Sequence, residues 1–95
     1  MPSERFTLSG DVIKPDFLDW ISHRARRLGL TGWAQEIPER HTIEILVDGP
    51  KDLLDAMELG CSLGPMTVWV ENIERTPCDA EEDIHNGFSL RRAGH

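Results

Sequence analysis

The sequence has few basic residues and no long apolar run. Ten lysines and arginines stand against 17 aspartates and glutamates, which gives a formal net charge of −7 at pH 7. A protein with this charge repels phosphodiester backbones, so we exclude general nucleic-acid binding. The apolar runs are far shorter than the roughly 20 residues that a membrane-spanning helix needs, so we exclude membrane insertion as well.

Cysteine and histidine are also sparse. The two cysteines, Cys61 and Cys78, could form at most one disulfide. We expect both to be free thiols, Cys61 in the core and Cys78 in a loop. The four histidines lack the spacing of zinc ligands, so we expect no metal site and no other cofactor. The amino terminus shows no charged segment followed by an apolar one, and we therefore expect a cytoplasmic protein.

Hydrophobic periodicity predicts an α+β fold of the ferredoxin-like type. We expect strands at residues 5–9, 31–37, 42–48, 67–75 and 88–91, with helices after Asp16 and Pro50, and a change of phase at Ile73 indicates a β-bulge. The order β-α-β-β-α-β plus a terminal strand places both helices on one face of a mainly antiparallel sheet. We expect one domain over residues 1–91 and a disordered tail at 92–95.

Several short motifs follow one another along the chain: Ser9-Gly10-Asp11-Val12, Leu28-Gly29-Leu30-Thr31-Gly32-Trp33, Asp48-Gly49-Pro50, Gly64-Pro65 and Phe88-Ser89-Leu90-Arg91. In their order and spacing, these motifs resemble those of the acylphosphatase family. The resemblance covers nearly the whole chain, with one extra residue in the turn from Pro38 to His41. It implies the ferredoxin-like sandwich of that family, and it implies hydrolysis of the carboxyl–phosphate bond of small acyl phosphates without a metal or cofactor.

The resemblance also implies a site with two parts. In the family, a loop of the pattern G-x-V-x-G-V-x-F-R cradles the phosphate with backbone N–H groups and grips it with the arginine. An asparagine on the next strand orients the attacking water. Glu36 stands at the asparagine position of this chain. The equivalents of the phosphate loop are Lys14, Pro15, Asp16, Phe17 and Leu18, with Leu18 at the arginine position.

These substitutions remove the groups on which the family's chemistry depends. Leu18 cannot bind phosphate, Pro15 has no amide hydrogen, and Asp16 adds a carboxylate at the mouth of the cradle. We expect Asp16 to cap the helix with its own carboxylate and thereby to fill the place of the phosphate. The catalytic residues stay unassigned, and we interpret the chain as a binding or regulatory module that is catalytically inactive or strongly impaired in acyl-phosphate hydrolysis.

Two further hypotheses stay open at this point. The chain could be a weak acylphosphatase in which Lys14, or the nearby Arg24 or Arg27, binds the phosphate. Trp69 and Leu46 alternate out of phase with the core positions of their strands. This predicts that both lie on the sheet face opposite the helices, where they could form a surface for a protein partner. A small ligand is the other open partner class, and we expect a monomer.

Overall fold

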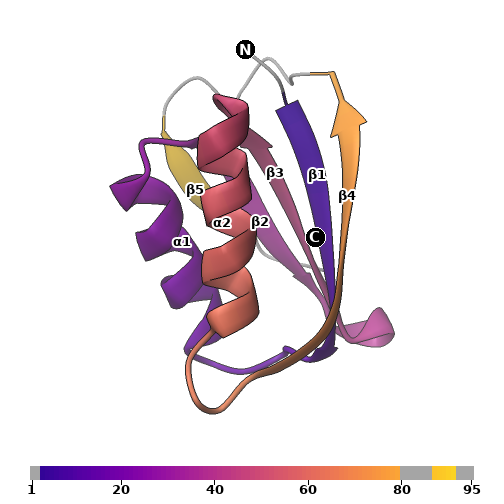
Figure 1. The fold of residues 1–95 in the computed structure, drawn as a ribbon. Helices are drawn as coiled ribbons and strands as arrows, with labels where there is room; N and C mark the ends of the chain where they lie inside the picture. The colour runs from indigo at the N-terminus through magenta and orange to yellow at the C-terminus, as the bar shows by residue number, and fades with distance from the viewer. Residues whose placement is uncertain (1–2, 80–86, 92–95) are drawn as a thin grey trace.

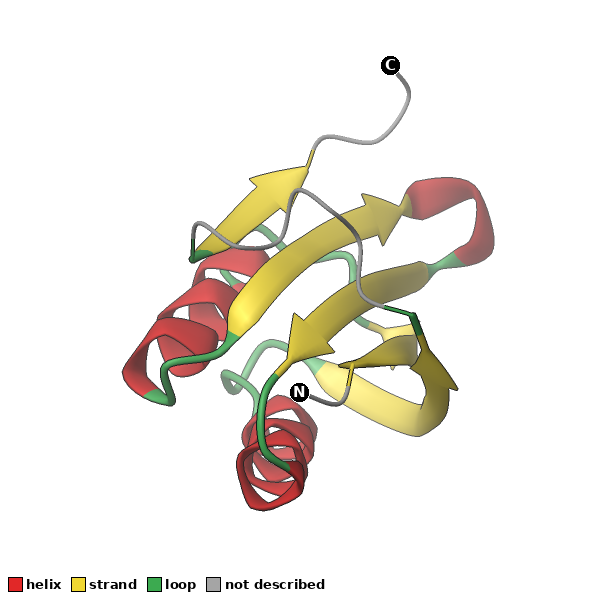
Figure 2. Ribbon diagram, turned by 90° about the horizontal axis from the view of Figure 1, so that it is seen from above, coloured by secondary structure: helices red, strands yellow, loops and turns green. Residues whose placement is uncertain are grey.

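The computed structural model describes residues 3–79 and 87–91, which form a sheet covered on one face by two helices (Figures 1 and 2). The strands have the spatial order β4-β1-β3-β2-β5. The fold is thus the predicted ferredoxin-like sandwich with an additional terminal strand. In chain order the elements are β1 (Ser3–Asp11), α1 (Phe17–Arg27), β2 (Thr31–Ile37), the 3-10 helix η1 (Pro38–Arg40), β3 (Thr42–Asp48), α2 (Lys51–Leu63), β4 (Trp69–Cys78) and β5 (Phe88–Arg91).

Strand direction decides which loops lie close together. β3 runs antiparallel to both β1 and β2, so β1 and β2 point the same way. They therefore end at the same edge of the sheet. The loop that follows β1 and the last residues of β2 lie at that edge, and this brings the two parts of the expected site to one end of the molecule.

The core lies between the sheet and the helices because apolar residues follow the period of each element. β1 directs Phe6 and Leu8 toward the helices, and α1 returns Phe17, Ile21 and Ala25 at helical spacing. All five have no exposed surface. This packing holds the start of α1 firmly against the end of β1.

A glycine ends α1 and turns the chain into β2. Gly29 has a φ of +73°, which is favourable for glycine and costly for other residues. Its N–H donates to the carbonyl of Arg26 at 3.1 Å, and the N–H of Leu30 donates to the carbonyl of Ala25 at 3.0 Å. These two bonds form a Schellman motif, which satisfies carbonyls that the last turn would leave without a donor.

The last long strand differs from its predicted bounds. We expected it at residues 67–75, whereas β4 runs from Trp69 to Cys78 because its pairing with β1 continues as far as Ser3. Cys78 is therefore a strand residue, and its expected place in a loop is wrong. The expected tail at residues 92–95 lies outside the described residues.

The predicted bulge in β4 is confirmed. The pairing with β1 passes from Val70 to Asn72 and skips Glu71. The extra residue brings Val70 and Ile73 to the same side of the strand, and both pack against the main core. Within the described part of the chain, no helix is long and apolar enough to cross a membrane.

Candidate functional site

The candidate site is the loop between β1 and α1, together with the end of β2. The loop covers residues 12–16, and Leu18 lies in the first turn of α1. Glu36 is the last residue but one of β2, where it pairs with Ile43 of β3. By strand alternation it lies on the same side of the sheet as the buried Ala34, which is the side covered by the helices. The fold therefore brings the loop and Glu36 to one edge and one face, as the resemblance implied.

The backbone of the loop is bonded to itself. The N–H of Lys14 donates to the carbonyl of Val12 at 3.0 Å, and the N–H of Phe17 donates to the carbonyl of Lys14 at 3.2 Å. Pro15 has no N–H group. Three of the positions from 14 to 17 thus offer no free backbone donor, so this loop makes a poor cradle for an anion.

The site has no free positive charge at position 18 or at position 14. Leu18 is partly buried and packs against the main core beside Phe17. The ammonium group of Lys14 lies 3.1 Å from a carboxylate oxygen of Asp11. The lysine charge is therefore balanced by a neighbour within the same loop.

The structure does not support the capping role that we expected for Asp16. Its backbone has φ −91° and ψ −10°, and its side chain makes no capping hydrogen bond. A capping side chain reaches the first-turn N–H groups when its own backbone is extended, and a helical backbone directs it away from them. The Asp16 carboxylate is exposed instead, so it does not occupy the place of a phosphate.

Glu36 is half-buried at the far side of this edge. Within residues 3–79 and 87–91, it forms no hydrogen bond or ion pair through its side chain. A carboxylate at this position repels an anion bound in the loop. Among the same residues, no group of three or more histidine, cysteine or acidic side chains is arranged to hold a metal ion.

The two residues proposed as a partner surface lie in different environments. Trp69 is 68% exposed, in agreement with its expected outward position. Leu46 is only 1% exposed, because Trp33 and Cys78 pack around it on the sheet face opposite the helices. The expected surface formed by Trp69 and Leu46 together is therefore wrong. Leu46 is instead part of a small second core.

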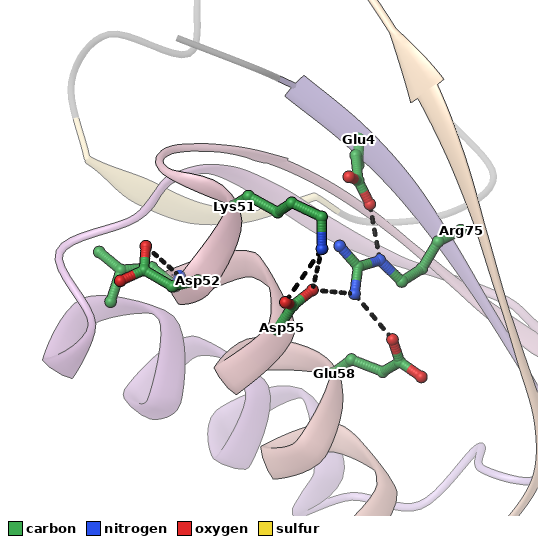
Figure 3. A network of polar contacts seen from close by, with 7 residues as sticks. Glu4, Lys51, Asp52, Asp55, Glu58 and Arg75 are labelled. Carbon is green, nitrogen blue, oxygen red and sulfur yellow. Dashed lines mark hydrogen bonds and ion pairs between the residues drawn. The ribbon is translucent and has the colours of Figure 1, made fainter.

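A polar network on β1, β4 and α2 was not predicted from the sequence (Figure 3). The Arg75 guanidinium donates to Glu4 at 2.6 Å, to Asp55 at 2.8 Å and to Glu58 at 2.8 Å. Lys51 adds an ion pair with Asp55 at 3.2 Å. The network joins α2 to the edge strand β4 and to its neighbour β1, and it lies away from the β1–α1 loop.

The charges of this network shift the pKa values of its members. The pKa of Asp55 is lowered, first by the hydrogen bond from Arg75 and then by that from Lys51. The pKa of Arg75 is raised above its ordinary value, chiefly by the hydrogen bond to Glu4. These partners are separated by up to 71 positions in the chain, and no local sequence pattern could have predicted them.

Neither the fold nor the local chemistry activates the buried cysteine. Cys61 is 1% exposed in α2, and burial raises the pKa of its thiol to about 12. The thiolate is the nucleophilic form, so this thiol is inert near neutral pH.

The comparisons with known proteins agree on one family. A family model described as Acylphosphatase matches residues 4–90. An acylphosphatase of Caldivirga maquilingensis is 33% identical over 87 residues, which are 92% of this chain and 90% of that protein. One of Acidiphilium cryptum is 35% identical over 94 residues, which are 99% and 100% of the two chains. The crystal structure of acylphosphatase from Bacillus subtilis superposes with a TM-score of 0.86 at 25% identity and covers 96% of this chain and 99% of its own.

Proposed function

The chain belongs to the acylphosphatase family, and from that premise we propose that it is a binding or regulatory module whose hydrolysis of acyl phosphates is strongly impaired. In the family, a phosphate is held by backbone donors and an arginine, and a water is oriented by an asparagine. Each of these three contributions is altered here. In this proposal the chain recognises a protein or a small ligand, with the substrate chemistry reduced.

One observation carries this proposal, namely the hydrogen bonding of the loop to itself. The N–H groups of Lys14 and Phe17 donate to carbonyls of the loop, and Pro15 has none. A phosphoryl transition state gains its stabilisation from donors that are already free and aimed at the reacting oxygens. A loop whose donors are used internally would have to break its own bonds before it could bind.

The loss in rate is expected to be large. Removing one donor of this kind costs about 10²–10³ in rate, and the arginine position adds a loss of similar size. We therefore expect hydrolysis of a chromogenic acyl phosphate at a rate about 10⁴-fold or more below that of a family member carrying the arginine and the asparagine. The acylphosphatase of Bacillus subtilis is a suitable reference protein.

Restoring the family's residues provides the direct test. We expect the variant Lys14→Gly, Pro15→Val, Leu18→Arg and Glu36→Asn to gain at least about 10²-fold in turnover. Leu18→Met is the matched control, because it alters the same packed side chain without adding a charge. Circular dichroism confirms that each variant is folded. Turnover by the unmodified chain at the rate of the reference protein would refute the proposal.

A weak hydrolase that uses Lys14 is the competing function, and the position of this lysine in the loop is what favours it. Its side chain is 34% exposed and is paired with Asp11. If Lys14 binds the phosphate, Lys14→Gln abolishes the residual hydrolysis and Asp11→Asn increases it. If the module proposal holds, neither change alters the background rate.

A further inference from the structure

One hollow on α1 has no acidic side chain among the described residues that line it. It measures about 310 Å³, and its wall consists of Trp20, His23, Arg24 and Arg27. The last three follow Trp20 by three, four and seven positions, so all four lie on one side of the helix. The chain as a whole has a net charge of −7. A hollow bordered by two guanidinium groups and an imidazole is therefore a local exception to the charge of the molecule.

The two arginines of this hollow have no carboxylate partner. Within residues 3–79 and 87–91, neither Arg24 nor Arg27 forms an ion pair or a side-chain hydrogen bond. The guanidinium of Arg75, by contrast, donates to three carboxylates of the same chain. The N–H groups of Arg24 and Arg27 are thus available to an acceptor from outside the chain.

Arg24 is held in place by contacts that do not use its N–H groups. Its Cζ atom lies 5.6 Å from the centre of the Trp20 ring. The indole N–H of Trp20 donates in turn to the carbonyl of Gly60 at 3.0 Å, which fixes the ring. Stacking occupies the flat side of a guanidinium and leaves the donors at its edge free. The position of Arg24 is therefore set before a ligand binds, and this lowers the entropic cost of binding.

Gly60 of α2 provides the space for this arginine, where α1 and α2 lie side by side (Figure 1). A Cβ added at Gly60 would lie 2.7 Å from Nε and 2.9 Å from Cγ of Arg24. Glycine inside a helix is unfavourable relative to alanine, and α2 continues past Gly60 to Leu63. The close approach of Arg24 gives a physical reason for a glycine at this position.

The end of α1 does not cancel the positive charge of the hollow. The last turn of a helix carries a partial negative charge of about half an elementary charge on its free carbonyls. Three of these carbonyls, at positions 24–26, accept hydrogen bonds of 3.0–3.1 Å from the N–H groups at positions 28–30. The dipole makes arginines favourable at this end of the helix, and their two full charges outweigh the partial charge that an anion would meet there.

We propose that this hollow binds a phosphate monoester, at a site separate from the β1–α1 loop. Guanidinium groups form paired, charge-assisted hydrogen bonds with phosphate oxygens. Arg24 and Arg27 lie about one turn apart, so both reach one phosphate group, and His23 supplies a further N–H donor. A carboxylate has two oxygens, whereas a phosphate monoester offers three terminal oxygens to these three side chains.

The size of the hollow favours an organic phosphate over the inorganic ion. Its volume of about 310 Å³ is about ten times the liquid volume of one water molecule. An organic group therefore fits beside the phosphate, and Trp20 gives it an apolar part of the wall.

This site goes beyond the proposed loss of hydrolysis and does not depend on it. Arg24 follows Asp16 by eight positions, which is about 12 Å along the helix axis. A phosphate bound at Arg24 and Arg27 therefore lies away from the β1–α1 loop and from Glu36 at the end of β2. The ligand is bound at this hollow and is not hydrolysed there.

Titration of the full chain with inorganic phosphate and with phenyl phosphate tests the site. We expect dissociation constants of about 1 mM or lower at constant ionic strength, with phenyl phosphate at least as tight as inorganic phosphate. The NMR signals to follow are the Nε–H groups of Arg24 and Arg27 and the indole N–H of Trp20. Signals that stay unmoved at about 20 mM of either ligand overturn the proposal. So does an equal movement with NaCl at the same ionic strength, and exclusion of phenyl phosphate overturns the assignment to a monoester.

Removal of single charges tests the two arginines. Arg24→Gln and Arg27→Gln should each weaken the binding of phenyl phosphate by about 5-fold or more. Arg40→Gln is the matched control, because it removes the same charge from η1, away from α1. This control should change the affinity by less than about 2-fold. Circular dichroism checks the fold of each variant, and equal weakening in all three would overturn the site, since only the net charge would then matter.

Gly60→Ala tests whether Arg24 is positioned by α2. This variant keeps both arginines, but the added methyl group displaces the side chain of Arg24. We expect about 3-fold weaker binding of phenyl phosphate, and no further loss when the same change is made in Arg24→Gln. A further loss of the same size in Arg24→Gln would overturn the positioning of Arg24 by Gly60.

The phosphate titration also separates this site from the proposed function. Movement of the backbone amide signals of residues 14–18 would contradict the proposed loss of hydrolysis. Unmoved side-chain signals of Arg24 and Arg27 would contradict the site on α1. The two results are read from different residues, so either proposal can fail without the other.

Discussion

Gly32 of β2 is a residue whose lack of a side chain is required by its neighbours. Its φ is +139°, and an added Cβ would overlap the carbonyl oxygen of Leu46 on β3. The backbone of β3 cannot move aside without breaking the hydrogen bonds that pair it with β2. We therefore predict that Gly32→Ala lowers the free energy of unfolding by about 3 kcal/mol or more, as measured by urea denaturation.

Gly29 provides the control for that prediction. It also has a positive φ, of +73°, but nothing lies within 4 Å of an added Cβ. Gly29→Ala thus carries the conformational cost alone, about 1 kcal/mol. Equal losses for the two variants would show that overlap with Leu46 contributes nothing.

Cys61 allows a second prediction at the residue scale. Burial raises the pKa of this thiol to about 12, so almost none of it is thiolate at pH 8. We predict that iodoacetamide leaves Cys61 unmodified in the native protein at pH 8 and modifies it after unfolding in urea. Peptide mass spectrometry locates the label. Rapid labelling of Cys61 in the native state would contradict the burial seen here.

At the scale of elements, Arg75 attaches α2 to the sheet. Its side chain and that of Glu4 are 19% and 17% exposed, so their contact is shielded from water to a larger extent than a typical surface pair. We predict that Arg75→Met lowers the free energy of unfolding by about 1–2 kcal/mol, because the carboxylates remain without their shared cation. Thermal and urea unfolding measure this loss.

The same network predicts a dependence on pH. Arg75 and Lys51 hold the pKa of Asp55 below its ordinary value of 3.8. The stabilisation from this carboxylate is therefore present above pH 3.8 and is lost as the pH falls through the lower folded value. We expect the unfolding midpoint of the unmodified chain to fall on acidification in this range. The fall should be smaller in Arg75→Met. An equal fall in the two proteins would show that Arg75 does not lower the pKa of Asp55.

The elements themselves were predictable because their signals are local. The alternation on β1 and the helical spacing on α1 depend on residues a few positions apart, and both were confirmed. Arg75 has partners on β1 and α2, so its role appears only when the chain is folded. The burial of Leu46 depends in the same way on Trp33, which lies on another strand. Long-range contacts of this kind leave no periodic trace in a sequence.

The candidate site also has features that the local sequence predicts and features that depend on the folded chain. The sequence places Leu18 and Glu36 correctly, because position along two predicted elements decides where they lie. It does not predict that the Asp16 side chain leaves the helix uncapped, because capping depends on the φ and ψ angles of that one residue. The hydrogen bonds within the loop are likewise set by the exact path from β1 to α1.

At the scale of the whole molecule, the net charge of −7 and the structure of the loop act in the same direction. A phosphate approaching the site meets the field of an acidic protein, and the loop that would offset this field has no arginine and few free donors. Lys14, its one cation, is paired with Asp11.

We therefore predict that about 10 mM inorganic phosphate leaves the backbone amide resonances of residues 14–18 unmoved in NMR spectra. The quadruple variant proposed above, which carries Leu18→Arg, should show shifts there under the same conditions. Shifts in the unmodified chain at this concentration would mean that the loop opens its own hydrogen bonds to bind an anion, and both the proposed loss of hydrolysis and its physical cause would then be wrong.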